Sequence, residues 1–132
     1  MENRLSLEDM VLAALSPAGC ETYRPLQVQK LFFLLDGTIA TRLGGAHFRF
    51  EQSDFGPFDP GVYGALEELA ADGLVSIRHQ TARRRTYSLT PAGLTRGRQV
   101  LNESFDDEAQ GRLARLNERV RSMSYVELVS AR

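Results

Sequence analysis

The chain has 132 residues, of which 42% are hydrophobic and 25% are charged, and its formal net charge at pH 7 is −1. These values are typical of one soluble globular domain with a single core. No run of 18 apolar residues predicts a transmembrane helix and no secretory signal is visible, so we expect no membrane partner and a cytoplasmic location. One cysteine (Cys20) and two histidines predict neither a disulfide nor a metal site, and we expect no cofactor.

The charges are distributed unevenly along the chain. Residues 1–66 carry five basic and eight acidic side chains, whereas residues 73–102 carry six arginines and no acid. A nearly neutral protein with one cationic stretch can bind a polyanion. The charge pattern therefore favours a nucleic acid as a partner.

Two helices are predicted at the start of the chain. The first spans residues 7–15, where Ser6 and Asp9 form a capping-box pattern. The second begins after Pro25 and spans residues 26–36. It is apolar nearly all round, which predicts that it is the central helix of the core. A short continuation of this helix is predicted up to Leu43.

The middle of the chain predicts a strand, a loop and a third helix. Residues 46–51 alternate between polar and aromatic side chains, which is typical of a half-buried strand. The composition of residues 53–59 is that of a loop. Pro60 then opens a helix that ends at Gly73.

A hairpin and two helices are predicted in the last part of the chain. Residues 74–78 and 85–90 have strand patterns, and the polar segment between them completes the hairpin. Thr90 caps a fourth helix that reaches about Asn102. A last helix spans 106–123, with a continuation to Val129.

This order of elements predicts a mainly α protein with a small β-sheet, arranged as a winged-helix (winged helix-turn-helix) domain with an additional C-terminal helix. Residues 1–132 form one domain, with a core over about 7–103 and the C-terminal helix over about 106–129. In such a domain three helices pack on a small sheet and the hairpin projects as the wing. The third helix takes the place of a recognition helix.

Two segments resemble bacterial winged-helix regulators. The segment 68–75, Glu-Leu-Ala-Ala-Asp-Gly-Leu-Val, is similar to the end of their recognition helix, and the segment 87–93, Tyr-Ser-Leu-Thr-Pro-Ala-Gly, to the strand and helix after the wing. The resemblance implies a DNA-binding regulator of transcription.

A second set of residues resembles the phage-associated Panacea (GepA-like) and YwgA-like proteins. Its parts are Lys30-Leu31-Phe32-Phe33-Leu34-Leu35 in the second helix, Phe55-Gly56-Pro57-Phe58 in the loop, and Val62, Tyr63 and Leu66 in the third helix. This resemblance implies a core helix, an aromatic-Gly-Pro loop that enters a helix, and an antitoxin-type domain that neutralises toxin partners. Panacea loops tend to carry a tryptophan, which this chain lacks, so the resemblance is nearer to the YwgA-like side.

The predicted hairpin and the helix after it carry the candidate DNA-binding residues. These are Arg78, Arg83, Arg84, Arg85, Arg96 and Arg98. Three consecutive arginines on a hairpin point to both faces, so that at least two guanidinium groups can reach phosphates or a narrow minor groove. The alternative is a solvated hairpin whose charges protect an exposed strand edge.

The residues of the third helix are poorly suited to recognise DNA bases. Helices that enter the major groove usually offer Arg, Lys, Asn, Gln, Ser or Thr near the N-terminus. This one offers aromatic, glycine and acidic residues instead, including Glu67 and Glu68, which repel phosphates. We therefore do not expect specific base reading by this helix.

Three aromatic residues are candidate partner-binding residues, namely Phe55, Phe58 and Tyr63. Exposed, they form an anchor patch for a protein partner, because large rigid side chains carry interface energy. Buried, they close the core over the strand before them, and we favour the buried reading.

Apolar residues in the last helix follow a 4-3-4-3 spacing from Ala109 onward. The candidate dimerisation residues are Leu113, Leu116, Val120 and Met123. Such a spacing is typical of a seam between two helices, and it predicts a homodimer. The alternative is a helix that folds back on its own domain.

No catalytic motif occurs in the sequence, which has no phosphate-binding loop, zinc motif or nucleophile elbow. We therefore expect a non-enzymatic DNA-binding protein, a transcriptional regulator that contacts phosphates through an Arg-rich wing. The alternative is a protein-interaction module of the antitoxin type that binds a toxin or another protein.

Overall fold

The structure, a computed structural model, describes residues 6–38, 51–53, 56–81 and 84–130. Its helices are α1 (Leu7–Leu15), η1 (Ser16–Ala18, a 3₁₀ turn), α2 (Pro25–Thr38), α3 (Pro60–Ala71), α4 (Pro91–Ser104), α5 (Asp107–Arg121) and α6 (Tyr125–Val129). Its strands are β1 (Glu51–Ser53), β2 (Gly56–Phe58), β3 (Val75–Thr81) and β4 (Arg84–Leu89). The predicted class of a mainly α protein with a small β-sheet is confirmed.

Local sequence signals set the beginnings of several helices. The Ser6 hydroxyl accepts a hydrogen bond from the backbone N–H of Asp9 at 3.1 Å, and the Thr90 hydroxyl accepts one from Gly93 at 3.1 Å. These contacts satisfy N–H groups that have no partner inside the helix. A proline is the first residue of α2, α3 and α4, where its missing N–H costs nothing.

The structure differs from the prediction in two segments. The predicted loop over 53–59 contains strand β2, which pairs antiparallel with β1, so that Glu51 lies opposite Phe58. The last helix does not continue to Val129 but ends at Arg121. A capping box between Ser124 and Glu127 then begins α6. The predicted strand residues 46–50 and the predicted continuation over 39–43 lie outside the described residues.

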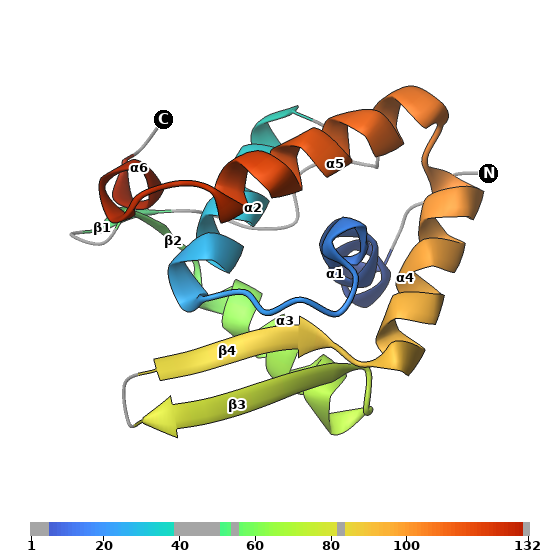
Figure 1. The fold of residues 1–132 in the computed structure, drawn as a ribbon, viewed down its shortest axis with the longest axis horizontal. Coiled ribbons are helices and arrows are strands. Elements are labelled where there is room, and N and C mark those ends of the chain that lie inside the picture. Colours follow the sequence, from blue (N-terminus) through green and yellow to red (C-terminus); the bar gives the residue numbers. More distant parts are fainter. Residues whose placement is uncertain (1–5, 39–50, 54–55, 82–83, 131–132) are drawn as a thin grey trace.

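Helix α1 lies at the centre of the molecule, with α2, α3, α4 and α5 around it (Figure 1). Its residues from Met10 to Leu15 are all buried, with at most 1% of each residue exposed. Helix α2 was predicted to be the central helix; it is well buried through Val28, Leu31 and Phe32, but it lies to one side of α1. A helix enclosed on every side can be apolar all round, and α1 has this property from Met10 to Leu15.

Helix α4 approaches α1 closely because of a glycine. A Cβ atom on Gly97 would lie 2.5 Å from the carbonyl oxygen of Leu12 in α1. A Cβ atom on Gly93, one turn earlier, would overlap the carbonyl oxygen of Leu74. The missing side chains at these two positions allow α4 to pack against α1 and against the start of the hairpin.

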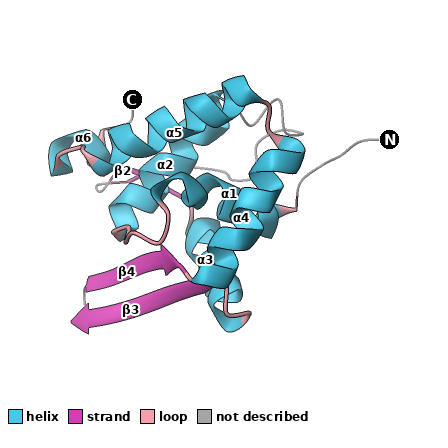
Figure 2. Ribbon diagram, turned by 45° about the vertical axis from the view of Figure 1, so that its right-hand side comes forward, coloured by secondary structure: helices cyan, strands magenta, loops and turns pink. Residues whose placement is uncertain are grey.

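The β3–β4 hairpin lies beneath the helices and projects from them at its far end (Figures 1 and 2). Its strands are antiparallel, with Val75 opposite Leu89 and Ile77 opposite Tyr87. The extended residue Tyr23, just before α2, exchanges two backbone hydrogen bonds with Tyr87 at 2.7 and 2.9 Å. Tyr23 thereby ties the chain between α1 and α2 to the edge of the hairpin.

Candidate nucleic-acid interface

Two of the predicted DNA-binding arginines, Arg78 and Arg85, have exposed side chains on the hairpin. They occupy neighbouring rungs of the ladder, where Arg78 lies opposite Thr86 and Arg85 lies opposite His79. Because side chains alternate along a strand, the two guanidinium groups leave the hairpin on opposite faces.

Arg85 has a partner within the protein. Its Nη1 donates a hydrogen bond to Oε2 of Glu67 in α3 at 3.4 Å, and the two side chains are 45% and 58% exposed. An ion pair this exposed adds little to stability, because solvent screens the two charges. It nevertheless offsets the charge that Arg85 presents to an anion.

The side chains of two further arginines of the predicted wing are not described. Arg83 lies outside the described residues. Arg84 begins β4 and its backbone pairs with Thr81, after an irregularity in the register that follows His79. Of Arg84, only the backbone is described.

The two arginines of α4 lie on different sides of that helix. Arg96 donates two hydrogen bonds to the carboxylate of Asp9 in α1, at 3.0 and 3.1 Å, so its charge is compensated. Arg98 lines a hollow of about 380 Å³ together with Ser16 and Gln110, near the C-terminal end of α1. The four predicted arginines whose side chains the structure describes therefore do not form one continuous surface.

Helix α3, in the predicted place of a recognition helix, has an acidic surface. Glu67, Glu68 and Asp72 are all exposed. The Asp59 carboxylate caps its N-terminus by accepting a hydrogen bond from Gly61 at 2.8 Å. These carboxylates repel a phosphate backbone, as the sequence predicted for this helix.

Tyr63 is held by the fold and is not a free anchor. It is half-buried, its hydroxyl donates to the carbonyl oxygen of Pro25 at 3.3 Å, and its ring stacks on Tyr87 with a centroid distance of 6.0 Å. Burial raises the pKa of Tyr63 to about 12. Of the other candidate partner-binding residues, Phe55 lies outside the described residues, and of Phe58 only the backbone, at the end of β2, is described.

The proposed dimer seam in the last helix is used inside the protomer. Leu113 and Val120 are 0% exposed and Met123 is 9% exposed in a single chain, while Leu116 is partly buried against the same core. The structure thus corrects the prediction that these residues pair two subunits. The 4-3 spacing describes the stripe by which α5 packs on its own domain, which was the alternative reading.

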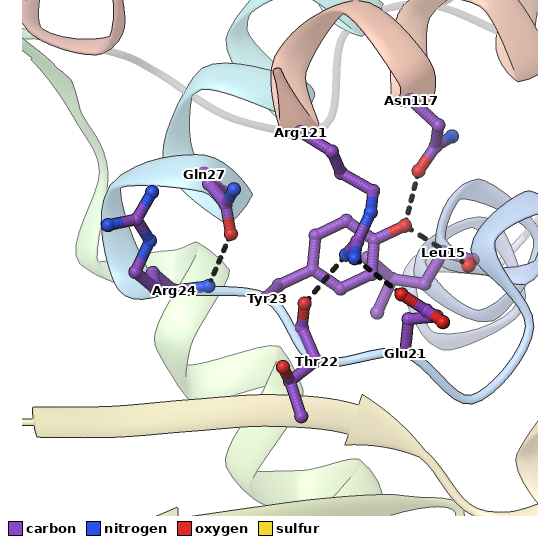
Figure 3. Close-up of polar contacts among 8 residues, drawn as sticks. All are labelled: Leu15, Glu21, Thr22, Tyr23, Arg24, Gln27, Asn117 and Arg121. Carbon is purple, nitrogen blue, oxygen red and sulfur yellow. Dashed lines mark hydrogen bonds and ion pairs between the residues drawn. The ribbon is translucent and has the colours of Figure 1, made fainter. Parts of the chain in front are cut away.

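A buried polar cluster that the sequence did not reveal joins α5 to the rest of the core (Figure 3). Asn117, 2% exposed, accepts a hydrogen bond from the Tyr23 hydroxyl and donates to the carbonyl oxygen of Ala14 at 2.9 Å. Arg121 lies over the Tyr23 ring at 5.1 Å and donates to the carbonyl oxygen of Thr22 at 2.6 Å. Asn117 lies one turn after Leu113, on the same buried stripe of α5. A polar residue at such a position is the signal by which the sequence could have indicated a buried polar contact.

Lys30, the first residue of the segment that resembles the Panacea and YwgA-like proteins, is another buried polar residue. It is 0% exposed, its Nζ donates to the carbonyl oxygen of Ser130, and it lies 5.7 Å from the centre of the Phe33 ring. Burial, together with the charge of Arg119, lowers the pKa of Lys30. The contact fastens the end of α6 to α2, which is a structural role.

The described part of the chain does not bring together a metal-binding set. Within it, no three His, Cys, Asp or Glu side chains lie close enough to hold a metal ion, and both His79 and Cys20 are exposed. Among the helices of the described ranges, none has the length and apolar character needed to cross a membrane.

Comparisons of the chain with protein-family models, with curated proteins and with solved structures find no match.

Proposed function

We propose that this protein is a non-enzymatic DNA-binding protein of the winged-helix class that contacts phosphates through the β3–β4 hairpin. The observation that carries the proposal is the charge of this region. Residues 73–102 contain six arginines and no acid, and Arg78 is exposed on the hairpin without a hydrogen bond or ion pair to any other described residue. An unpaired guanidinium group on a projecting element is suited to phosphate oxygens.

The order of elements supports the winged-helix class. Helix α1, the extended residue Tyr23, helices α2 and α3, the β3–β4 hairpin and helix α4 follow one another as in that fold. One feature departs from it, because α2 ends at Thr38 and α3 begins only at Pro60. A helix-turn-helix joins its two helices through a turn of about 3–4 residues. We therefore include no groove-reading helix in the proposal.

The same features favour binding without sequence preference. Phosphate contacts position a protein on the duplex but do not distinguish sequences, and the acidic surface of α3 opposes direct base reading. A role in transcription is an expectation from the resemblance to winged-helix regulators, and it rests on analogy between folds.

Salt-dependent binding to duplex DNA tests the proposal. We expect fluorescence anisotropy with a mixed-sequence duplex to show binding at 50 mM salt that weakens steadily up to 200 mM. Each phosphate contact adds about −0.9 to the slope of log affinity against log salt. A second duplex of unrelated sequence should bind with the same affinity within about threefold, since phosphate contacts do not discriminate. Absence of binding at 50 mM salt would refute the proposal.

A second candidate function is the protein-interaction module. The observation that favours it is a pair of exposed apolar side chains on α6, Tyr125 at 57% and Val126 at 74% exposure. Helix α6 packs on β2, which contains part of the aromatic-Gly-Pro segment that resembles the Panacea proteins. Binding of a toxin-like partner that is lost in Tyr125→Ala with Val126→Ser, but kept in Arg78→Ala, would support this function over DNA binding.

A further inference from the structure

The β3–β4 hairpin has two faces of different chemistry. The register and the alternation of side chains place four residues on the inner face, toward α3 and the core, namely Val75, Ile77, Tyr87 and Leu89. The residues between them form the outer face, namely Ser76, Arg78, Thr86 and Ser88. On the outer face, Ser76 lies opposite Ser88 and Arg78 lies opposite Thr86.

Every side chain of the outer face can donate a hydrogen bond, and none is acidic. Arg78 is exposed and the three hydroxyl residues are partly exposed. Among the described residues, none of these four side chains has a hydrogen-bond or ion-pair partner. The two rows of the ladder are about 6.7 Å apart along the strands. The outer face is therefore a small set of donors without partners, and its one permanent positive charge lies in the row nearer the tip of the hairpin.

The inner face near the end of the hairpin is different, because its arginine is paired. Arg85 donates to Glu67 of α3 at 3.4 Å, and the exposed Glu68 belongs to the same helix. A phosphate that approached on this side would meet carboxylates and would have to compete with Glu67 for Arg85. These carboxylates repel a phosphate that comes close to them.

We infer that the phosphodiester backbone of a nucleic-acid duplex binds to the outer face of the hairpin, the face turned away from α3. This inference rests on the proposed DNA-binding function, and it adds which face of the hairpin the duplex contacts. Arg78 contacts one phosphate together with the hydroxyl of Thr86, and the hydroxyls of Ser76 and Ser88 contact its neighbour. Helix α3 stays on the far side of the hairpin and does not enter a groove. This orientation also explains why acidic residues on α3 are compatible with DNA binding.

The hairpin supplies a matched pair of variants that test the orientation. Arg78→Ala and Arg85→Ala remove the same charge from opposite faces of one element. For Arg78→Ala we expect about a tenfold loss of duplex affinity at 50 mM salt and a salt slope that is smaller by about 0.9. For Arg85→Ala we expect both values to stay close to those of the unmodified protein. Thr86→Val, which removes a hydroxyl and keeps the branched shape, should weaken binding by a few fold.

The acidic side supplies a second, independent test. If the duplex lies on the outer face, Glu68→Gln changes affinity by less than about twofold at 150 mM salt, because the Debye length there is about 8 Å. A rise in affinity for Glu68→Gln would place the duplex on the α3 side and overturn the inference. Loss of binding in Arg85→Ala but not in Arg78→Ala would overturn it in the same way, while leaving the proposed function intact.

Two further outcomes separate this inference from the function on which it rests. If the unmodified protein does not bind duplex DNA at 50 mM salt, both fail together. If it binds vesicles containing 30% phosphatidylserine more tightly than the duplex, the outer face serves a membrane surface and the inference is wrong. Thermal melts of both arginine variants, expected to match the unmodified protein, exclude a folding defect as the cause of any loss.

Discussion

The hydroxyl of Tyr23 donates a hydrogen bond to Oδ1 of Asn117, which lies 94 residues further along the chain. Asn117 returns to α1 by donating to the carbonyl oxygen of Ala14 at 2.9 Å, and it donates to Leu113 within α5 at 3.0 Å. Tyr23 also holds the edge of the hairpin through Tyr87. One buried amide thus connects three elements, and inside a core such a fully bonded group specifies a single arrangement of its neighbours.

Replacing this amide should be costly. We expect Asn117→Leu to lower the free energy of unfolding by about 2–4 kcal/mol, because it removes the buried hydrogen bonds that Asn117 makes with the Tyr23 hydroxyl and the Ala14 carbonyl oxygen. The Tyr23 hydroxyl then keeps only the carbonyl oxygen of Leu15, at 3.3 Å. Urea unfolding measures the effect. Asn102→Leu, at an exposed position of α4, is the control and should change stability by less than about 0.5 kcal/mol. In a cycle with Tyr23→Phe, the two effects should fail to add by at least about 0.5 kcal/mol. Strict additivity would mean that the hydrogen bond contributes nothing.

Two glycines in helices should respond oppositely to the same substitution. Gly97→Ala places a methyl group 2.5 Å from the Leu12 carbonyl oxygen and forces α4 away from α1, so we expect a loss of about 1–3 kcal/mol. Gly111→Ala in α5 meets only the mobile end of Arg115, at 3.5 Å, and should stabilise by about 0.5–1 kcal/mol. Thermal melts of both variants check this. A stabilised Gly97→Ala protein would show that α1 and α4 do not pack this closely.

The buried stripe of α5 predicts how its variants depend on protein concentration. Leu113→Ala should cost about 2–5 kcal/mol, because the side chain fills space inside a single protomer. The midpoint of thermal unfolding should not change over a hundredfold range of protein concentration, for either this variant or the unmodified protein. If the midpoint of thermal unfolding rises with protein concentration, the protein associates, and the dimer that the spacing predicted is supported instead. Arg115→Ala, on the exposed side of α5, is the matched control.

The stability of the protein should fall in alkaline solution. Burial raises the pKa of Tyr63 from its ordinary value of 10.0 to about 12, so the folded chain keeps this proton at a pH where the unfolded chain releases it. Unfolding therefore becomes easier as the pH rises from about 10 toward 12, and below pH 10 the contribution is fully present. Burial also raises the pKa of Tyr23, which acts in the same direction.

Tyr63→Phe isolates the contribution of this residue. Urea midpoints measured between pH 8 and pH 11 should fall less steeply above pH 10 in the variant than in the unmodified protein. Between pH 8 and pH 9 the difference between the two proteins should be constant. If the two proteins lose stability in parallel above pH 10, the Tyr63 hydroxyl is not protected by the fold.

Features that depend on neighbours a few residues away could be predicted from the sequence. Ser6 and Thr90 cap helices that begin at the next residue, and prolines are the first residues of α2 and α4. The strand patterns of the hairpin likewise depend on residues close together in the sequence. The β1–β2 pair was missed, because three-residue strands that contain Gly56 and Pro57 carry no clear alternation.

Which side chains are available to a partner depends on contacts between distant segments, and these contacts could not be predicted from the sequence. All six arginines were predicted to bind DNA. In the structure, Arg96 is paired with Asp9, 87 residues away, and Arg85 is paired with Glu67. Arg78, in contrast, has no partner among the described residues. The stripe through Leu113 and Val120 has the same spacing whether it meets a second subunit or its own core, and the fold places it inside. Spacing fixes the face of a helix on which a side chain lies, but what that face meets depends on packing between distant segments.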